Sequence, residues 1–205
     1  MKPFYERYWK NKRNFHDFSY KWPVVKRFLP KEKKVTLLDY GCGSGLYLRK
    51  MLEFPNLKII GADVSEKLIG NLKKQFPKQQ FVKLSEDKRL PFATNSFDFI
   101  ICLDVIEHVY DVELLLSEFN RILKKDGELI ITTPYHGIFK NIVLSLFFFD
   151  EAFNPVGPHI RFFTIKSLSL ALEKAKFKVL HTVGFGRWWP LWRGLCIVVR
   201  NKKRV

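Results

Sequence analysis

Short apolar runs of strand length alternate with segments of helical periodicity along most of this chain, and this alternation restricts the fold more than any other feature. The strand-like runs are Val35–Tyr40, Leu57–Ala62, Gln80–Leu84, Phe97–Leu103, Gly127–Thr133, Lys178–Gly184 and Gly194–Arg200. The helical patterns between them are Leu46–Phe54, Glu66–Gln75, Val112–Leu123 and Ile165–Ala175. Strands that alternate with helices pair in parallel and are covered on both faces. The sequence therefore predicts an α/β fold with a mostly parallel sheet, whose ligand crevice lies at the carboxyl ends of the strands.

Length, cysteine content and hydropathy narrow the class of protein further. The 205 residues fit a single domain, 1–205, and no linker or repeat marks a second one. The three cysteines form no C-x-x-C pair, so neither a disulfide framework nor a structural zinc site is indicated. No apolar run has the length of a signal peptide or a membrane span, and we expect a cytoplasmic protein.

The charge balance is strongly basic. The 36 Lys and Arg exceed the 20 Asp and Glu by 16, and the segment 1–34 supplies half of this excess, with its basic residues interleaved with aromatic ones. We expect this segment to form a helical cap. A field of this sign favours anionic partners, whether nucleic acid, a membrane surface or an acidic substrate.

A glycine loop follows the first predicted strand and opens a helix. Its sequence is Asp39-Tyr40-Gly41-Cys42-Gly43-Ser44-Gly45, with spacing G-x-G-x-G rather than the G-x-G-x-x-G of dinucleotide sites. Glycines allow the backbone to approach a ligand closely, and the first amides of the helix face it. An acid two residues before the first glycine would repel a pyrophosphate and attract an ammonium or sulfonium group. This pattern argues against NAD and for a cofactor that carries an amino acid.

A second acid, Asp63, ends the next predicted strand, where a carboxylate can accept hydrogen bonds from both hydroxyls of a ribose. A glycine cluster alone is often only a turn. The acid, the loop and the second acid in one unit favour a cofactor site.

The sequence resembles the class I S-adenosylmethionine-dependent methyltransferases. Within that family, the order of its segments is most similar to that of the O-methyltransferases of quinone biosynthesis. Segment 37–45 resembles the first motif of that family, and three further motifs follow in order: Leu90–Ile100 (the LPF...SFD segment), Asp104–Val109 (the EHV segment) and Leu123–Leu129 (the L-K-P-G-G turn, with Lys125 in place of proline). The resemblance implies a Rossmann-like fold with a seven-stranded sheet, in which the last strand, Gly194–Arg200, is antiparallel.

The resemblance also implies which residues hold the cofactor, S-adenosyl-L-methionine. The methionine part would lie on Asp39, Gly41, Cys42, Gly43 and Gly45. Asp63, with Val64 beside it, would bind the ribose, Leu103 would contribute backbone contacts near the sulfonium, and Glu86, or else its neighbour Asp87, would meet the adenine amino group.

Three histidines are candidates for a general base, because a hydroxyl acceptor benefits from a base of near-neutral pKa. His108 belongs to the EHV segment, His136 follows the fifth strand, and His159 has the placement of a histidine in the quinone-biosynthesis branch. In that branch an acidic pair ahead of E-H can bind a divalent ion. Here Asp104, Glu107 and His108 would supply such ligands, but a solvated helix start is the favoured interpretation and no metal site is predicted.

Residues 137–161 interrupt the strand and helix rhythm as a hydrophobic insertion. The run Ile142–Phe149 is too short to cross a bilayer, so it is either a core helix or an interfacial lid that makes peripheral contact with a membrane. We predict methyl transfer to a small hydrophobic or aromatic acceptor, which includes lipid-like molecules, at oxygen.

Two alternatives to this function stay open. One is transfer to RNA or another polyanion, which the basic and aromatic N-terminus favours. The residues after the fourth strand lack the N-P-P-Y-like motif of enzymes that methylate exocyclic base amines. The other is a non-catalytic protein that binds S-adenosylmethionine.

Overall fold

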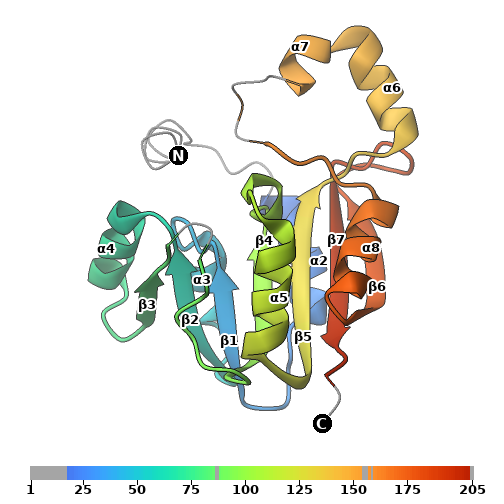
Figure 1. The fold of residues 1–205 in the computed structure, drawn as a ribbon. Coiled ribbons are helices and arrows are strands. Elements are labelled where there is room, and N and C mark those ends of the chain that lie inside the picture. The colour runs from blue at the N-terminus through green and yellow to red at the C-terminus, as the bar shows by residue number, and fades with distance from the viewer. Residues whose placement is uncertain (1–17, 86–87, 154–156, 158, 204–205) are drawn as a thin grey trace.

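The computed structural model describes residues 18–85, 88–153, 157 and 159–203, and its strands form one seven-stranded sheet in the order β3-β2-β1-β4-β5-β7-β6 (Figure 1). The strands are β1 (Val35–Tyr40), β2 (Leu57–Asp63), β3 (Gln80–Lys83), β4 (Phe97–Leu103), β5 (Leu123–Pro134), β6 (Phe177–Phe185) and β7 (Gly194–Asn201). The first five run parallel, and β7 is antiparallel to both β5 and β6. The predicted α/β class and the antiparallel last strand are confirmed.

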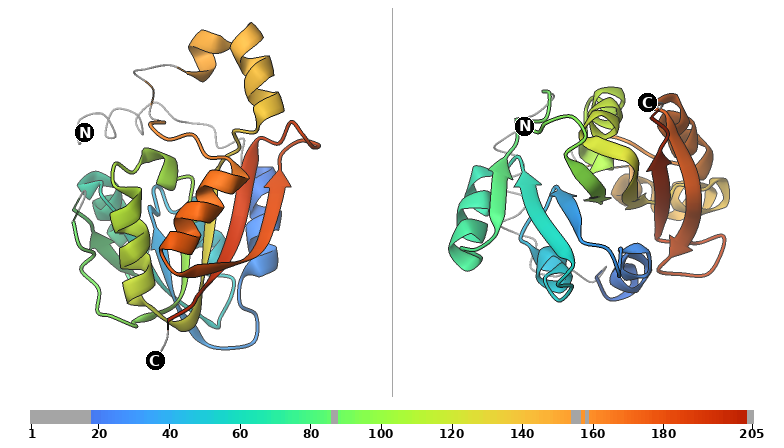
Figure 2. Two further views of the ribbon diagram at one scale, coloured as in Figure 1. Left: turned by 45° about the vertical axis from the view of Figure 1, so that its right-hand side comes forward. Right: turned by 90° about the horizontal axis from the view of Figure 1, so that it is seen from below.

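Helices cover both faces of the sheet (Figure 2). They are α2 (Phe18–Phe28), α3 (Leu46–Met51), α4 (Glu66–Gln75), the 3-10 helix η1 (Ile106–His108), α5 (Val112–Ile122), α6 (Ile138–Phe147), α7 (Phe149–Ala152) and α8 (Ile165–Lys174). Of the predicted cap 1–34, α2 is the helical part within the described residues, and residues 1–17 lie outside them.

Two apolar cores lie on opposite faces of the sheet, because successive side chains of a strand point to opposite sides. Leu38 packs in one core, which contains α5 and α8, and its neighbour Leu37 packs in the other, with α2, α3 and α4. The strands are therefore buried on both faces, as their nearly continuous apolar sequences predict.

Side-chain caps fix where several helices begin. The Ser65 hydroxyl accepts a hydrogen bond from the Leu68 amide at the start of α4, and the Asp111 carboxylate accepts one from the Leu114 amide at the start of α5. Thr164 and Ser167 form a reciprocal capping box at the start of α8. Each of these residues satisfies amides that have no partner in the first helical turn.

β5 begins four residues earlier than the sequence predicts. Leu123 already pairs with Phe97, and the register then shifts before Glu128 pairs with Phe99. Asp126 takes a φ of 60° within this irregularity. The turn signal at 124–127 is therefore a bulge inside the strand rather than a break before it.

α6 and α7 extend away from the carboxyl-end edge of the sheet (Figures 1 and 2). α6 has no buried residue, and Ile138, Leu146 and Phe147 are 80%, 71% and 72% exposed. Among the described residues, no helix has the length and apolar character needed to cross a membrane.

The chain order reverses beside β1, since β2 and β3 extend the sheet on one side of β1 and β4 continues it on the other. In open α/β sheets a ligand binds outside the carboxyl ends of the strands at such a point. The glycine loop after β1 and the EHV segment after β4 both lie there.

Candidate cofactor and acceptor site

The glycine loop adopts a backbone that only glycine accommodates well. Gly41, Gly43 and Gly45 have φ values of 75°, 53° and 77°. A Cβ atom on Gly41 would lie 2.3 Å from Cγ2 of Val105, and one on Gly45 would lie 2.6 Å from Cδ2 of Leu72. The loop thus packs against Val105, which follows β4, and against Leu72 of α4, so a side chain at Gly41 or Gly45 would displace these neighbours.

Asp39 is a buried carboxylate below this loop. It is 3% exposed, and its Oδ2 atom has no hydrogen-bond partner among the described residues. Burial, and then the nearby charge of Asp63, raise the pKa of Asp39 to about 7. A buried carboxylate of this kind is stabilised when a cation binds beside it.

Asp63 holds the glycine loop in place. Its Oδ2 accepts a hydrogen bond of 2.9 Å from the Gly43 amide, and its Oδ1 accepts one of 2.8 Å from the Ser65 amide. Burial raises the pKa of Asp63, and these amide bonds act in the opposite direction. Each carboxylate oxygen accepts more than one hydrogen bond, so Asp63 can still accept from ribose hydroxyls.

Of the other predicted cofactor residues, the structure describes three and leaves two outside the described residues. Cys42 is buried, and burial followed by the charges of Asp39 and Asp63 raises the pKa of its thiol, so that it stays neutral. Leu103 is buried at the end of β4, and Val64 is half-buried after Asp63. Glu86 and Asp87 lie outside the described residues.

Together, these features fit an aminoacyl sulfonium nucleoside. The partnerless Oδ2 of Asp39 would bind the ammonium group, and Asp63 would bind the ribose. The amides of Gly41, Gly43 and Gly45 already donate to the Ala62 carbonyl, the Asp63 carboxylate and the Cys42 carbonyl, so the glycines would let the methionine part approach the backbone closely rather than supply free donors. The loop offers no cation for a diphosphate among the described residues.

A small cavity of about 40 Å³ lies at the carboxyl ends of β4, β5 and β6 and at the amino end of β7. Its lining includes Lys21 and Asp104, which form an ion pair, and Lys21 also lies 5.9 Å from the centroid of the Phe185 ring. Thr132 fixes Asp104, because its hydroxyl donates to the Asp104 carboxylate over 2.8 Å. No pattern in the sequence predicts this contact, since α2 and the end of β4 are far apart in the chain.

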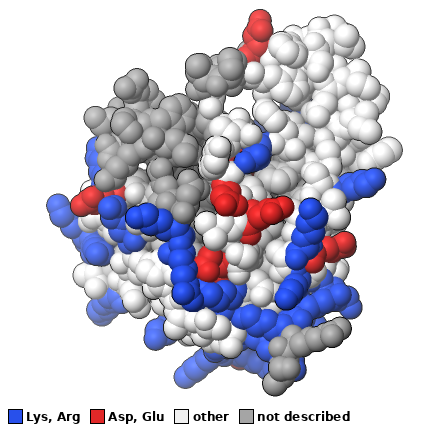
Figure 3. Space-filling view, viewed as in Figure 1, with Lys and Arg blue, Asp and Glu red and all other residues white. Residues whose placement is uncertain are grey.

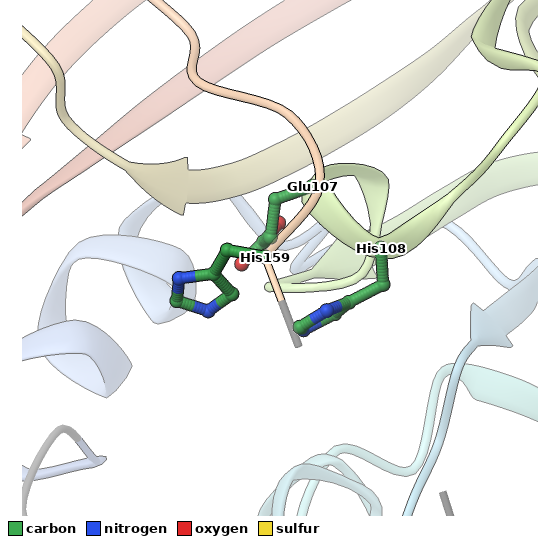
Figure 4. A group of neighbouring side chains, drawn as sticks. All are labelled: Glu107, His108 and His159. Carbon is green, nitrogen blue, oxygen red and sulfur yellow. The ribbon is translucent and has the colours of Figure 1, made fainter. Parts of the chain in front are cut away.

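Glu107, His108 and His159 form a cluster beside the crevice (Figure 4). The carbonyl of Glu107 accepts hydrogen bonds from the amides of Ile160 and Arg161, which brings the segment at His159 against η1. The two imidazole rings are 5.0 Å apart between centroids. One ligand atom from each of the three residues lies within 4.8 Å of the others, so the cluster could hold a divalent transition-metal ion.

His136 has different neighbours. It is 7% exposed, its ring lies 4.8 Å from that of Phe162, and its Nδ1 is 3.2 Å from the Asn141 side chain. Burial and the charge of Lys140 lower the pKa of His136. These contacts connect β5 to α6, whereas His108 and His159 pair with each other.

The LPF segment is held by two residues of α5 that the sequence analysis did not identify. The Glu118 carboxylate accepts from the Leu90 amide over 2.7 Å, and Arg121 donates to the carbonyls of Leu90 and Phe92. Glu118 and Arg121 also pair with each other at 2.7 Å. The spacing of three residues on a predicted helix is the one signal that could have suggested this pair.

Comparison with known proteins gives a family match and several relatives. A family model described as "Methyltransferase domain" matches residues 10–182. The tRNA U34 carboxymethyltransferase of Nautilia profundicola is 32% identical over 171 residues, which cover 80% of this chain and 54% of that protein. The malonyl-[acyl-carrier protein] O-methyltransferase of Legionella pneumophila is 31% identical over 109 residues, covering 52% and 38% of the two chains.

Solved structures agree on the fold. An S-adenosylmethionine-dependent methyltransferase from Aquifex aeolicus superposes with a TM-score of 0.72 at 19% identity, over 95% of this chain and 97% of the other. Against the tRNA relative, in contrast, the chain spans about half of the relative's length.

Proposed function

This chain belongs to the methyltransferase domain family, whose cofactor is S-adenosylmethionine, and on that premise we propose that it transfers the methyl group of this cofactor to an RNA acceptor. The sequence alone left both a small hydrophobic acceptor and an RNA acceptor open, and the relatives favour one of them. A tRNA-modifying enzyme is similar over 80% of this chain, and this favours RNA over the small hydrophobic acceptor that we expected first.

The charge of the molecule supports an RNA acceptor. The net charge of +16 attracts a polyanion over a long range. Lys and Arg gather over the lower half of the face in Figure 3, below the crevice, while the part over α6 and α7 is largely uncharged. A long RNA could contact this basic surface while one nucleotide reaches the crevice.

The buried Oδ2 of Asp39, which has no hydrogen-bond partner among the described residues, is the observation that carries the cofactor part of the proposal. When bound, the cofactor supplies an electrophilic methyl group on a sulfonium. The chain's residues then have to align the acceptor with that methyl, and correct alignment can lower a barrier by roughly 7–11 kcal/mol. The cavity beside Asp104 and Leu103 is where we place the acceptor.

We further propose that His159 accepts the proton of an acceptor hydroxyl. His159 is exposed next to the half-buried His108, and the buried carboxylate of Glu107 lies beside the His159 side chain (Figure 4). A carboxylate close to an imidazole favours its protonated form, which helps the ring to take up a proton. His108 would orient His159, and His136 would position the start of α6.

The test is methyl transfer from labelled S-adenosylmethionine to fractionated cell extract. We expect label in RNA, removed by ribonuclease and insensitive to protease. Label that appears only in the lipid, protein or small-molecule fractions would contradict an RNA acceptor while leaving the methyltransferase activity intact.

A small hydrophobic acceptor is the second candidate, and one observation favours it. α6 carries an exposed apolar surface above the crevice, which would suit a lid over a lipid-like molecule that is drawn from a membrane surface. The similarity to a malonyl-[acyl-carrier protein] O-methyltransferase is consistent with an acceptor other than RNA. In the extract experiment this candidate predicts label soluble in organic solvent.

A further inference from the structure

The loop between β6 and β7 carries two exposed indoles between two arginines. Trp188 and Trp189 are 70% and 68% exposed, and Arg187 and Arg193 on either side are exposed as well. Neighbouring tryptophans on a surface offer flat apolar faces on which nucleobases stack.

Packing of Trp192 and a backbone hydrogen bond hold the loop that carries the two exposed indoles against the sheet. Trp192 packs against Tyr135 with 5.4 Å between ring centroids. A Cβ on Gly184 would lie 1.8 Å from Cδ2 of Trp192, so the indole lies directly on the backbone of β6. The Arg193 amide donates to the Phe185 carbonyl over 2.9 Å, which closes the loop.

Lys140 of α6 joins this loop. Its ammonium group donates to the Tyr135 carbonyl over 2.7 Å and contacts the Arg193 carbonyl at 3.5 Å. Burial, and then the charges of Arg187 and Arg193, lower the pKa of Lys140 to about 8. The three cations are therefore close enough to repel one another.

Within the described part of the chain, no carboxylate forms an ion pair with Lys140, Arg187 or Arg193. Asp104, which lines the same cavity as Arg193, pairs with Lys21. Three neighbouring cations without a carboxylate partner are an arrangement that a phosphate group would stabilise.

The loop also reaches the acceptor cavity. Arg193 and Gly194 line the cavity together with Lys21 and Asp104, and the Arg193 guanidinium lies 5.7 Å from the centroid of the Tyr20 ring. A ligand held by the loop would therefore continue into the cavity.

We propose that Lys140 and the loop Arg187–Arg193 form a binding site for single-stranded RNA, in which the cations hold backbone phosphate and Trp188 and Trp189 stack on bases next to the target nucleotide. This inference rests on the proposed RNA acceptor and deepens it, since it says how a strand is held at the crevice. The general basic surface of Figure 3 lies elsewhere, below the crevice.

An anionic membrane surface is the competing partner for exposed indoles and cations. The exposed apolar side chains of α6 would suit it, but the charge of the neighbouring helices does not. Segment 138–153 contains Lys140, Asp150 and Glu151, which gives this projecting part a net charge of −1. Asp150 is exposed on α7 and would repel anionic lipid head groups.

Binding of fluorescein-labelled oligouridylate to the full chain tests the site. Lys140→Gln, Arg187→Gln and Arg193→Gln form one combined variant, and Lys67→Gln, Lys73→Gln and Lys74→Gln on α4 form a control with the same loss of charge. Each phosphate contact contributes about 0.7 to the slope of log affinity against log salt for single strands. We expect the loop variant to lose about 2 units of slope and the control to lose much less; equal losses would overturn the proposal.

Stacking has a separate readout. Oligouridylate should quench tryptophan fluorescence of the wild type, and Trp188→Leu with Trp189→Leu should remove this quenching and weaken binding by about 5- to 150-fold per stacked base. Unchanged cofactor affinity and melting temperature show that each variant is folded. Undiminished RNA affinity, or tighter binding to anionic phosphatidylserine vesicles than to RNA at the same salt, would overturn the site.

The two proposals fail differently. If RNA binds at the loop but takes up no methyl group, the proposed function is wrong and the binding site stands. If RNA is methylated and the loop variants methylate it at the wild-type KM, the site is wrong and the proposed function stands.

Discussion

The carboxylate of Asp39 lies where ionisation is unfavourable, and this affects both folding and binding. Its pKa is about 7 in the folded chain against the ordinary value of 3.8, so the folded state holds more protons than the unfolded state between these pH values. Stability therefore falls as pH rises from about 4 to 7, and stays reduced above 7. A bound ammonium group would offset this loss.

Asp39→Asn should consequently stabilise the empty protein and weaken cofactor binding. At pH 8 we expect the melting temperature to rise by at least about 3 °C, with a smaller gain at pH 5 because the native carboxyl is then already neutral. Asp150→Asn, at an exposed position, is the control for loss of one negative charge. Differential scanning calorimetry checks the result, and a lower melting temperature at pH 8 would show that Asp39 has a stabilising partner.

The same pKa predicts how cofactor affinity depends on pH. Below pH 7 the Asp39 carboxyl must lose its proton before it can pair with an ammonium group, so affinity should fall by about tenfold per pH unit. Titration calorimetry of S-adenosylmethionine between pH 5.5 and 7, in buffers of different ionisation enthalpy, should show close to one proton released per molecule bound at pH 5.5, and about half a proton at pH 7 because the carboxyl is then half ionised. If the affinity for S-adenosylmethionine does not change over this pH range, Asp39 is not the residue that binds the ammonium group.

His159→Ala should slow turnover by about 10²-fold and leave the affinity for S-adenosylmethionine unchanged, because a positioned base contributes about this factor. Added imidazole should restore part of the rate. His181→Ala changes a histidine at an exposed position of β6 and serves as the control. Wild-type turnover in the His159 variant would exclude it as the base.

At the scale of elements, α5 positions the LPF segment through buried charge-assisted bonds. The hydrogen bond from Arg121 lowers the pKa of Glu118, so the stability that this carboxylate contributes is present above its ordinary pKa and is lost as pH falls below it. Residues 90–96 of this segment, ahead of β4, form no helix or strand and depend on these bonds for their position.

Glu118→Gln should therefore destabilise the chain by about 1–3 kcal/mol at pH 7, because the charge-assisted bonds to Leu90 and Arg121 are weakened. The loss should shrink at pH 4. Arg89→Gln is the matched control, since that side chain is 72% exposed and 4.0 Å from Glu118. Urea denaturation measures both variants, and equal small effects would mean that the LPF segment is held by its apolar contacts alone.

The elements themselves were largely predictable from the sequence, and the contacts between them were not. β1, β4 and α4 begin and end at the predicted residues, because their apolar patterns are bounded by charges, glycines or a capping serine. The glycine loop and Asp63 were found for the same reason, as they follow strands directly. The pairing of Lys21 with Asp104, and of His159 with Glu107 and His108, depends on how α2 and the segment after α7 pack, and no periodic signal reports such contacts.

At the scale of the molecule, two parts differ in packing: the sheet with its two apolar cores, which we call the body, and the projecting helix α6. The two cores lie against the sheet, whereas α6 contributes no buried side chain and stands above the carboxyl ends of the strands (Figure 2). Substitutions in the body should therefore change the free energy of unfolding, whereas substitutions on α6 should change only the binding of a ligand at the crevice.

A combined variant with Ile142→Gln, Leu146→Gln and Phe147→Gln tests this separation. Each side chain is more than half exposed, so we expect each replacement to change the free energy of unfolding by no more than about 0.5 kcal/mol. Leu48→Ala, at a fully buried position of α3, should instead cost about 2–5 kcal/mol. If the acceptor is RNA held at the β6–β7 loop, the α6 variant should methylate RNA at the wild-type rate, whereas a lipid-like acceptor under a lid would lose most of its turnover. Both assays use the same folded protein. If the α6 variant methylates RNA much more slowly than the wild type, α6 and not the β6–β7 loop binds the RNA acceptor.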